Sequence, residues 1–289
     1  MDYSNKALKI SNLIDYYKSK FPQIKSDSFW EKVKVYYRTS DLSYREVFKD
    51  IIFVNKYKAM FNRGVQKLPS NVLDDSILLL GPALSGKSSV GTELSKQIGL
   101  DIIHMEDKRY LKSFYDRANI IFYKGSFLDK FKSIKQYREK HFPGKVYNNQ
   151  RKYNMFLIAT VLESLREPKI VCVTEAFAFF NNPLMQYIFE EGISWFKNRI
   201  LVVPSLDKKD CSKVLTNRFK DKYDKLIHGT IEDREVVQKR LINTNDYLDH
   251  CLESRNFSYV LTTNGKTIEN EVVELRTHLE KQKIVEQEI

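Results

Sequence analysis

The stretch SILLLGPALSGKSSVGTELSKQIGL, Ser76 to Leu100, decides the fold. It begins with an apolar run over 76–80, passes through a short loop with a glycine at each end, and continues as a helical pattern over 87–98. A short apolar run bounded by turn residues indicates a buried strand. The loop from Gly81 to Ser88 fits G-x-x-x-x-G-K-[ST] at every position.

This loop pattern predicts a phosphate cradle. Its backbone N–H groups wrap a phosphate, which requires glycine where a Cβ would collide or φ is positive. The helix that follows directs its partly positive N-terminus at the anion. We expect Lys87 to reach the β- and γ-phosphates and the Ser88 hydroxyl to bind Mg²⁺. The alternative is an ordinary strand-to-helix turn. The predicted nucleotide contacts are Gly81, Pro82, Ala83, Leu84, Ser85, Gly86, Lys87, Ser88 and Ser89.

Short apolar runs alternate with helical patterns in the rest of the chain. The predicted strands are 76–80, 101–105, 169–174, 199–204 and 258–263, and the predicted helices are 87–98, 154–167, 207–226 and 266–282. This alternation is typical of an α/β fold with a parallel sheet and helices on both faces. We therefore predict an α/β domain over 71–289.

The first 70 residues are predicted to be helical. Leu8, Ile10, Leu13, Ile14 and Tyr17 lie roughly on one helical face. Two capping-box spacings mark further helix starts, Ser28 with Glu31 and Ser43 with Glu46. Gly and Pro in the segment 62–71 predict a linker to the α/β domain.

Composition and charge restrict the class of protein. The chain of 289 residues has a net charge of +11 and a pI near 9.3, which favours an anionic partner or reflects a merely basic surface. No apolar run approaches a membrane span, and the start has no signal-peptide pattern. The odd set of distant cysteines fits neither disulfides nor zinc, so we expect a cytoplasmic protein; they are Cys172, Cys211 and Cys251.

Phosphoryl transfer needs a carboxylate near the attacking hydroxyl, and two acidic positions follow predicted strands. Asp107 follows the second strand, where we expect it to act as the base or orienting group with Arg109 as a substrate anchor. The alternative is a helix cap and a solvated arginine. Glu175 follows the third strand and is expected near the acceptor, holding Mg²⁺ through water, or else serving as a structural carboxylate.

Basic residues complete the expected site. Arg218, Arg234 and Arg240 flank a polar, lid-like stretch around Gly229, and we favour Arg218 and Arg234 as catalytic. The alternative for each is a solvated helix face. The turn at Asn264 and Gly265 could meet an adenine edge or be a plain turn.

The segment 131–154 is basic and aromatic. It could hold an anionic acceptor through Arg138, Lys145 or Arg151, bind nucleic acid, or be a solvated surface.

The order of these parts resembles shikimate-kinase-like phosphotransferases, a group within the nucleoside-monophosphate-kinase branch of P-loop proteins. The resemblance covers about residues 74–285 and rests on the Gly81–Ser88 loop, Asp107 after the second strand, LVVPSLDKKDCSKVLTNRF and YVLTTNGKTIENEVVEL. It implies a five-stranded parallel sheet in the order 2-3-1-4-5, ATP and Mg²⁺ as co-substrates, and a lid arginine best matched by Arg218.

The chain also departs from that group. TEAFAFF replaces a glycine triplet after the third strand, and MEDKR replaces a D-x-D motif, which indicates an acceptor other than shikimate. Zeta-type toxins and chloramphenicol phosphotransferases share the general layout.

The leading hypothesis is an ATP-dependent kinase of a small, anionic acceptor. The alternatives are a nucleotide-regulated module that binds nucleic acid or a partner protein through its N-terminal helices, and a loop without chemistry.

Overall fold

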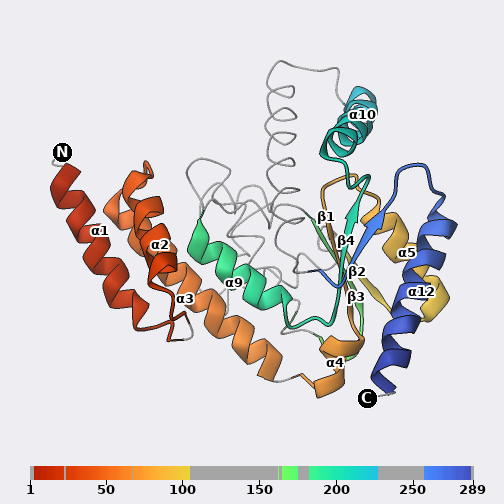
Figure 1. Ribbon diagram of the computed structural model, residues 1–289, viewed down its shortest axis with the longest axis horizontal. Helices are drawn as coiled ribbons and strands as arrows, with labels where there is room; N and C mark the ends of the chain where they lie inside the picture. Colours follow the sequence, from red (N-terminus) through yellow and green to blue (C-terminus); the bar gives the residue numbers. More distant parts are fainter. Residues whose placement is uncertain are drawn as a thin grey trace, which may run out of the picture.

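The computed structural model describes residues 3–22, 24–66, 68–104, 162, 165–174, 182–226 and 257–287. Five short strands form one sheet in which every neighbouring pair is parallel, in the order β2-β3-β1-β4-β5 (Figure 1). The predicted α/β sheet and its strand order are therefore confirmed. The strands are β1 (Ile77–Gly81), β2 (Ile102–His104), β3 (Ile170–Thr174), β4 (Asn198–Val203) and β5 (Tyr259–Thr262).

Helices cover both faces of this sheet because the central strands are apolar on both sides. In β1, Ile77 and Leu79 point to one face, while Leu78 and Leu80 point to the other. Both sets are buried, so the continuous apolar run at 77–80 contributes side chains to two separate hydrophobic cores, one on each face of the sheet.

The first core lies under α5 (Lys87–Ile98) and α12 (Ile268–Gln287), which pack side by side on one face (Figure 1). Val90 and Leu94 of α5 and Val272 and Leu275 of α12 supply its helical part. These apolar residues recur at helical spacing, which is why these segments form helices with one face on the sheet.

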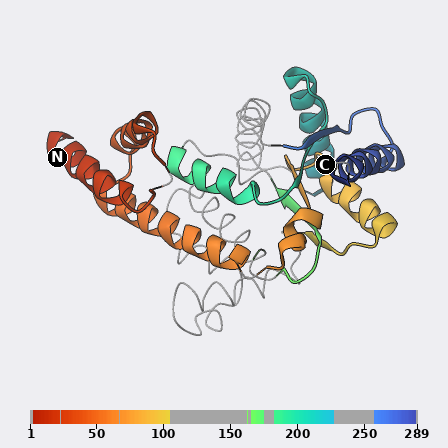
Figure 2. The ribbon, with the colours of Figure 1, turned by 60° about the horizontal axis from the view of Figure 1, so that its bottom comes forward.

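The second core lies on the opposite face and extends into the N-terminal helices. It joins β1 and β3 to α9 (Pro183–Ile193) and to the short α4 (Ser70–Asp75), and continues through α1 (Tyr3–Lys18), α2 (Asp27–Thr39) and α3 (Tyr44–Gln66). Figure 2 shows α9 between the N-terminal helices and the sheet.

The division into a helical region of 1–70 and an α/β domain of 71–289 stays a prediction.

A buried hydrogen bond ties the N-terminal helices to the start of α9. The Asn182 side chain donates to the Tyr37 hydroxyl at 2.8 Å, and its Oδ1 accepts the N–H of Leu184 at 3.1 Å. Tyr37 is fully buried, and burial raises the pKa of its hydroxyl. Because a buried polar group must find a partner, this bond fixes how α2 faces α9.

One of the two predicted capping boxes is confirmed and the other is wrong. Ser43 and Glu46 exchange hydrogen bonds at the start of α3, with the Ser43 N–H 2.8 Å from Glu46 Oε2. At the start of α2 the cap is Ser26, not Ser28, because Ser26 Oγ accepts the N–H of Phe29. Glu31 instead pairs with Lys34.

Two predicted boundaries also need correction. The predicted linker over 62–71 is mostly helical, since α3 continues to Gln66 and α4 begins at Ser70. The helix predicted over 154–167 lies mainly outside the described residues, but Leu165–Glu167 are not helical. Among the described helices, none combines the length and apolarity required to span a bilayer.

Candidate functional site

The loop over 81–88 lies at the carboxyl edge of the sheet, between the end of β1 and the start of α5 (Figure 1). β1 is the middle strand of the five, so the loop is flanked by the ends of β3 and β4. Ligands of open parallel sheets bind at this edge. The fold therefore puts the predicted phosphate cradle where such a site is expected.

Both glycines of the loop are required by geometry. A Cβ on Gly81 would lie 2.2 Å from the carbonyl oxygen of Val202, a backbone atom of the neighbouring strand. Gly86 has φ +103°, a conformation that L side chains rarely adopt, and a Cβ there would lie 3.3 Å from Thr263 Cγ2. Larger residues at these two positions would displace either the sheet or the loop.

Leu84 adopts φ +65° and is the only non-glycine residue with positive φ in the described part of the chain. This left-handed conformation costs a leucine about 1–2 kcal/mol. Arg218 of α10 (Lys208–Leu226) donates from Nη1 to the Leu84 carbonyl oxygen at 2.8 Å. The predicted lid arginine thus contacts the loop and holds the strained residue.

Lys87 lies across the loop with only 3% of its surface exposed. Its Nζ donates to the carbonyl oxygen of Pro82 at 3.0 Å, spanning from the first turn of α5 to the start of the loop. A buried ammonium needs acceptors around it, and phosphate oxygens are strong ones. Beneath the same turn, the thiol of Cys172 donates to the Lys87 carbonyl oxygen at 3.7 Å, and burial raises the pKa of this thiol to about 12.

The end of β5 supports the loop from its other side. Thr263 Oγ1 donates to the Ser85 carbonyl oxygen at 2.8 Å, and both residues are buried. The next two residues, Asn264 and Gly265, are exposed, and the N–H of Asn264 donates to the Pro204 carbonyl oxygen. The predicted base-contacting turn therefore follows directly on a residue that touches the loop. Sequence reasoning missed Thr263, although it immediately precedes the Asn-Gly turn.

A second set of contacts joins the loop helix to the end of β2. Thr92 Oγ1 donates to the Ser88 carbonyl oxygen at 2.8 Å and lies 3.3 Å from His104 Nε2. His104 ends β2, three residues before Asp107. Sequence reasoning also missed His104; its signal was its place at a strand end.

An acidic group lies near Arg218. Glu271, in the first turn of α12, is only 4% exposed. Burial raises the pKa of its carboxyl, while the charges of Arg218 and Lys266 act in the opposite direction. This acid partly balances the cations beside the loop.

Several predicted site residues lie outside the described residues. These are Asp107, Arg109, Arg138, Glu175, Arg234 and Arg240. Their roles stay predictions. Among the described residues, no three His, Cys, Asp or Glu side chains gather as a metal site, and Ser88, the predicted magnesium ligand, has an exposed side chain at the start of α5.

The arrangement of the described residues suits an anion. Among them, no acceptor pairs with the N–H groups of Leu84, Gly86 and Ser88. All three donors belong to the loop or to the first turn of α5, where the N-terminus of the helix favours an anion. An anion would satisfy groups that the loop itself does not satisfy.

No protein-family model matches this chain, and no curated protein matches it either.

Proposed function

We propose that this chain is an ATP-dependent phosphotransferase with a P-loop NTPase fold, which moves the γ-phosphate of ATP to a hydroxyl of a small anionic molecule. One observation carries the proposal. A complete G-x-x-x-x-G-K-S motif lies at the carboxyl edge of a five-stranded parallel sheet, with its lysine buried across the loop and its glycines at positions that exclude a Cβ.

Different residues contact the phosphates, the magnesium ion and the base of the nucleotide. Loop amides and Lys87 hold the β- and γ-phosphates, and Ser88 binds Mg²⁺ together with phosphate oxygens. We propose that Asn264 and Gly265 contact the base, because they follow Thr263, which donates a hydrogen bond to the loop. Arg218 donates a hydrogen bond to the Leu84 carbonyl oxygen of the loop, and its positive charge would stabilise the negative charge on the phosphoryl group during transfer.

The transfer itself forms a bond between the acceptor oxygen and the γ-phosphorus and breaks the bond from that phosphorus to the β–γ bridging oxygen. ADP leaves with the electron pair, and the proton of the acceptor hydroxyl passes to a carboxylate. Asp107 is the proposed carboxylate because it follows β2, whose end is joined through His104 and Thr92 to the loop helix.

Nucleotide binding is tested by calorimetric titration of ATP with magnesium. Lys87→Ala should weaken ATP binding about 10- to 100-fold, because a charge-assisted hydrogen bond to phosphate is worth about 1.5–3 kcal/mol. Lys96→Ala is the matched control, since Lys96 lies on the same helix and is exposed in a pair with Glu93. Equal ATP affinity in the two variants would disprove the phosphate site.

Transfer is tested with ATP labelled at the γ-phosphate and a panel of phosphorylated and carboxylated alcohols. Asp107→Asn should abolish transfer and leave ATP affinity nearly unchanged. Turnover at the wild-type rate in this variant would remove Asp107 from its role, and ATP binding without transfer to any acceptor would remove the kinase activity.

A further inference from the structure

The first helices carry a positive charge that the proposed kinase site does not use. Residues 3–40 contain eight Lys and Arg but only three Asp and Glu. The three acids are Asp15, Asp27 and Glu31. This segment covers α1 and α2, which pack against one another at the end of the molecule away from α5 and α12 (Figure 1).

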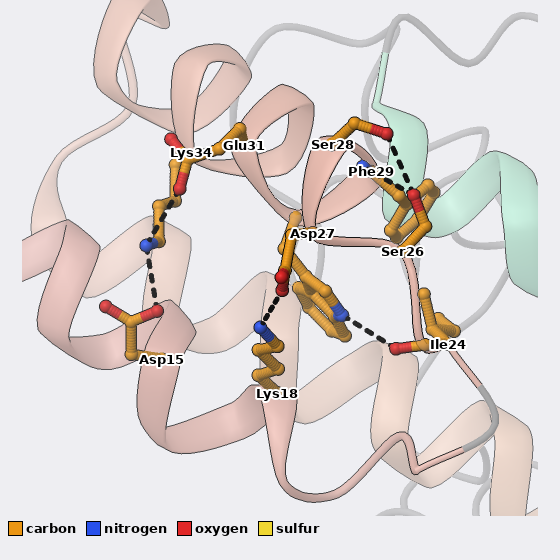
Figure 3. A network of polar contacts seen from close by, with 10 residues as sticks. Asp15, Lys18, Ile24, Ser26, Asp27, Ser28, Phe29, Glu31 and Lys34 are labelled. Atoms are coloured by element: carbon orange, nitrogen blue, oxygen red, sulfur yellow. Dashed lines mark hydrogen bonds and ion pairs between the residues drawn. The ribbon is translucent and has the colours of Figure 1, made fainter.

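All three acids are engaged by two lysines between these helices (Figure 3). Lys34 Nζ lies 2.8 Å from Asp15 and 3.1 Å from Glu31, while Lys18 pairs with Asp27. Five further cations are exposed and make no ion pair with any described residue. They are Lys9, Lys20, Lys25, Lys32 and Arg38. Lys18 and Lys34 offset two of the three acidic charges, and the segment 3–40 keeps a net charge of +5, from eight cations and three acids.

Aromatic rings are exposed in the same region. Tyr16 of α1 is 63% exposed, and Tyr44 and Phe48 at the start of α3 are 42% and 39% exposed. Among the described residues, the one other large aromatic side chain exposed to this degree is Trp195, at the end of α9. Lys20 Nζ lies 5.8 Å from the centre of the Tyr16 ring, so a cation and an open ring stand together.

We propose that the exposed cations of the N-terminal helices, together with the exposed ring of Tyr16, bind single-stranded nucleic acid. These residues, called the N-terminal basic surface below, are Lys9, Tyr16, Lys20, Lys25, Lys32 and Arg38. Unpaired cations contact the phosphates of such a strand and release its counterions, and exposed rings stack with its unpaired bases. A duplex hides its bases, so the rings would have no stacking partner there.

A membrane surface fits the observations less well. The exposed residues of α1 include one aliphatic side chain, Leu8, and one aromatic side chain, Tyr16, and the others are polar or charged: Asn5, Lys9, Asn12 and Asp15. Its apolar face, with Ile10, Leu13 and Ile14, is already buried in the protein core. A helix that inserts into lipid needs a continuous exposed apolar face, which α1 does not present.

The two helices that carry these residues are anchored in the protein core. Trp30, Val33 and Tyr37 of α2 and Ile10 and Ile14 of α1 belong to the core that reaches the sheet. Binding therefore need not fold these helices, which favours affinity.

The proposal is tested by fluorescence anisotropy with a labelled single strand of about 20 nucleotides. The triple variant Lys9→Gln, Lys20→Gln, Lys32→Gln should bind about 10- to 100-fold more weakly at low salt. Its plot of log affinity against log salt should lose a slope of about 2, because each single-strand phosphate contact contributes about 0.7. The matched control, Lys209→Gln, Lys213→Gln, Lys281→Gln, removes three exposed lysines from α10 and α12 and should bind like wild type.

Tyr16→Ala tests the stacking part of the proposal and should weaken binding about tenfold. Trp195→Ala is its control, since that exposed ring lies on α9. Lys87→Ala should bind the strand as wild type does, so that failure of the nucleotide site and failure of this surface remain distinguishable.

Three results would overturn the proposal. The first is wild-type protein that does not bind the strand, including protein that binds only phosphatidylserine vesicles. The second is equal affinity of the two triple variants. The third is a duplex of the same length that binds as tightly as the single strand, with Tyr16→Ala without effect.

Discussion

The 81–88 loop and the N-terminal helices are held by contacts of different range. The loop carbonyls of Leu84 and Ser85 accept bonds from Arg218 and Thr263, which lie 134 and 178 residues away in the sequence. In the N-terminal helices, the caps and most ion pairs join residues that are close in sequence, such as Ser26 with Phe29 and Lys18 with Asp27. The loop therefore acquires its conformation only when the sheet is assembled. The caps of the N-terminal helices are specified locally, and it is the packing of these helices that depends on distant residues such as Asn182.

The strongest test of the loop's dependence on the sheet is Gly81→Ala. The added Cβ would lie 2.2 Å from the Val202 carbonyl oxygen and 2.9 Å from Ser85 Oγ. A backbone carbonyl in a central strand cannot move without breaking the sheet, so we expect the free energy of unfolding to fall by more than about 4 kcal/mol. Urea denaturation measures it.

The matched control for this prediction is Gly91→Ala on α5. Its Cβ would approach side-chain atoms, Cys172 Sγ and Ile102 Cδ1 at 2.8 Å, which can shift. We expect a loss of about 1–3 kcal/mol. If Gly81→Ala were as stable as Gly91→Ala, the close approach of Gly81 at the end of β1 to Val202 of β4 would be wrong.

Trp30→Ala tests whether the N-terminal helices unfold with the sheet. Trp30 is 2% exposed and its indole N–H donates to the Ile24 carbonyl oxygen at 3.1 Å. Its removal should cost about 3–4 kcal/mol. Because the core around it continues to β1 and β3, hydrogen exchange of the β1 and β3 amides should accelerate in parallel with that of α2.

Trp195→Ala serves as the control for Trp30→Ala. Because Trp195 is 45% exposed, its replacement should lower the free energy of unfolding by less than about 0.5 kcal/mol. Faster exchange confined to α1–α3 in Trp30→Ala, with β1 and β3 unchanged, would show that the N-terminal helices form a separate cooperative unit.

The same difference in range explains what could be predicted from the sequence. All five strands lie within one residue of the predicted ranges, because a buried parallel strand must be a continuous apolar run. The G-x-x-x-x-G-K-S motif indicated the loop, since its two glycines stand where a Cβ would collide with a neighbour or where φ is positive. Arg218 was predicted as a residue of the site. Its bond to the Leu84 carbonyl oxygen, and that of Thr263 to the Ser85 carbonyl oxygen, could not be predicted, because no local pattern encodes which distant side chain meets a given carbonyl.

Local signals also failed where two choices were equally good. Ser26 and Ser28 are both suitable caps, and Glu31 follows Ser28 at the capping-box spacing. The helix begins at Asp27 with Ser26 as its cap, and Glu31 pairs with Lys34, which also contacts Asp15 on α1. The local spacing alone did not select between the two serines.

Ser26→Ala tests that selection. Loss of the cap, whose Oγ accepts the Phe29 N–H at 3.3 Å, should lower the free energy of unfolding by about 1 kcal/mol. Ser28→Ala removes only a contact with Ser26 Oγ and should cost a few tenths, about 0.3 kcal/mol. Chemical denaturation of both variants measures the difference, and a larger cost for Ser28→Ala would restore Ser28 as the cap.

The smallest expected effect separates two acids on α12. Burial raises the pKa of the Glu271 carboxyl above its ordinary value, so the folded state binds that proton more tightly than the unfolded state. The ionised carboxylate therefore costs stability at neutral pH, and this cost disappears as the pH falls through the folded-state pKa. Glu271→Gln should gain about 0.5 kcal/mol at pH 7 and nothing below about pH 4.

Glu274, one turn along α12, should behave in the opposite way. Burial acts to raise the pKa of its carboxyl, but hydrogen bonds from Lys266 and from Tyr259, the latter at 2.6 Å, lower it overall. Its stabilisation is present above the ordinary pKa and is lost as the pH falls through the lowered one, so Glu274→Gln should lose about 0.5 kcal/mol at pH 7. Denaturation from pH 3 to 8 compares the two variants. The same sign of effect in both would mean that burial, and not the partners of each acid, sets the charge balance beside the loop.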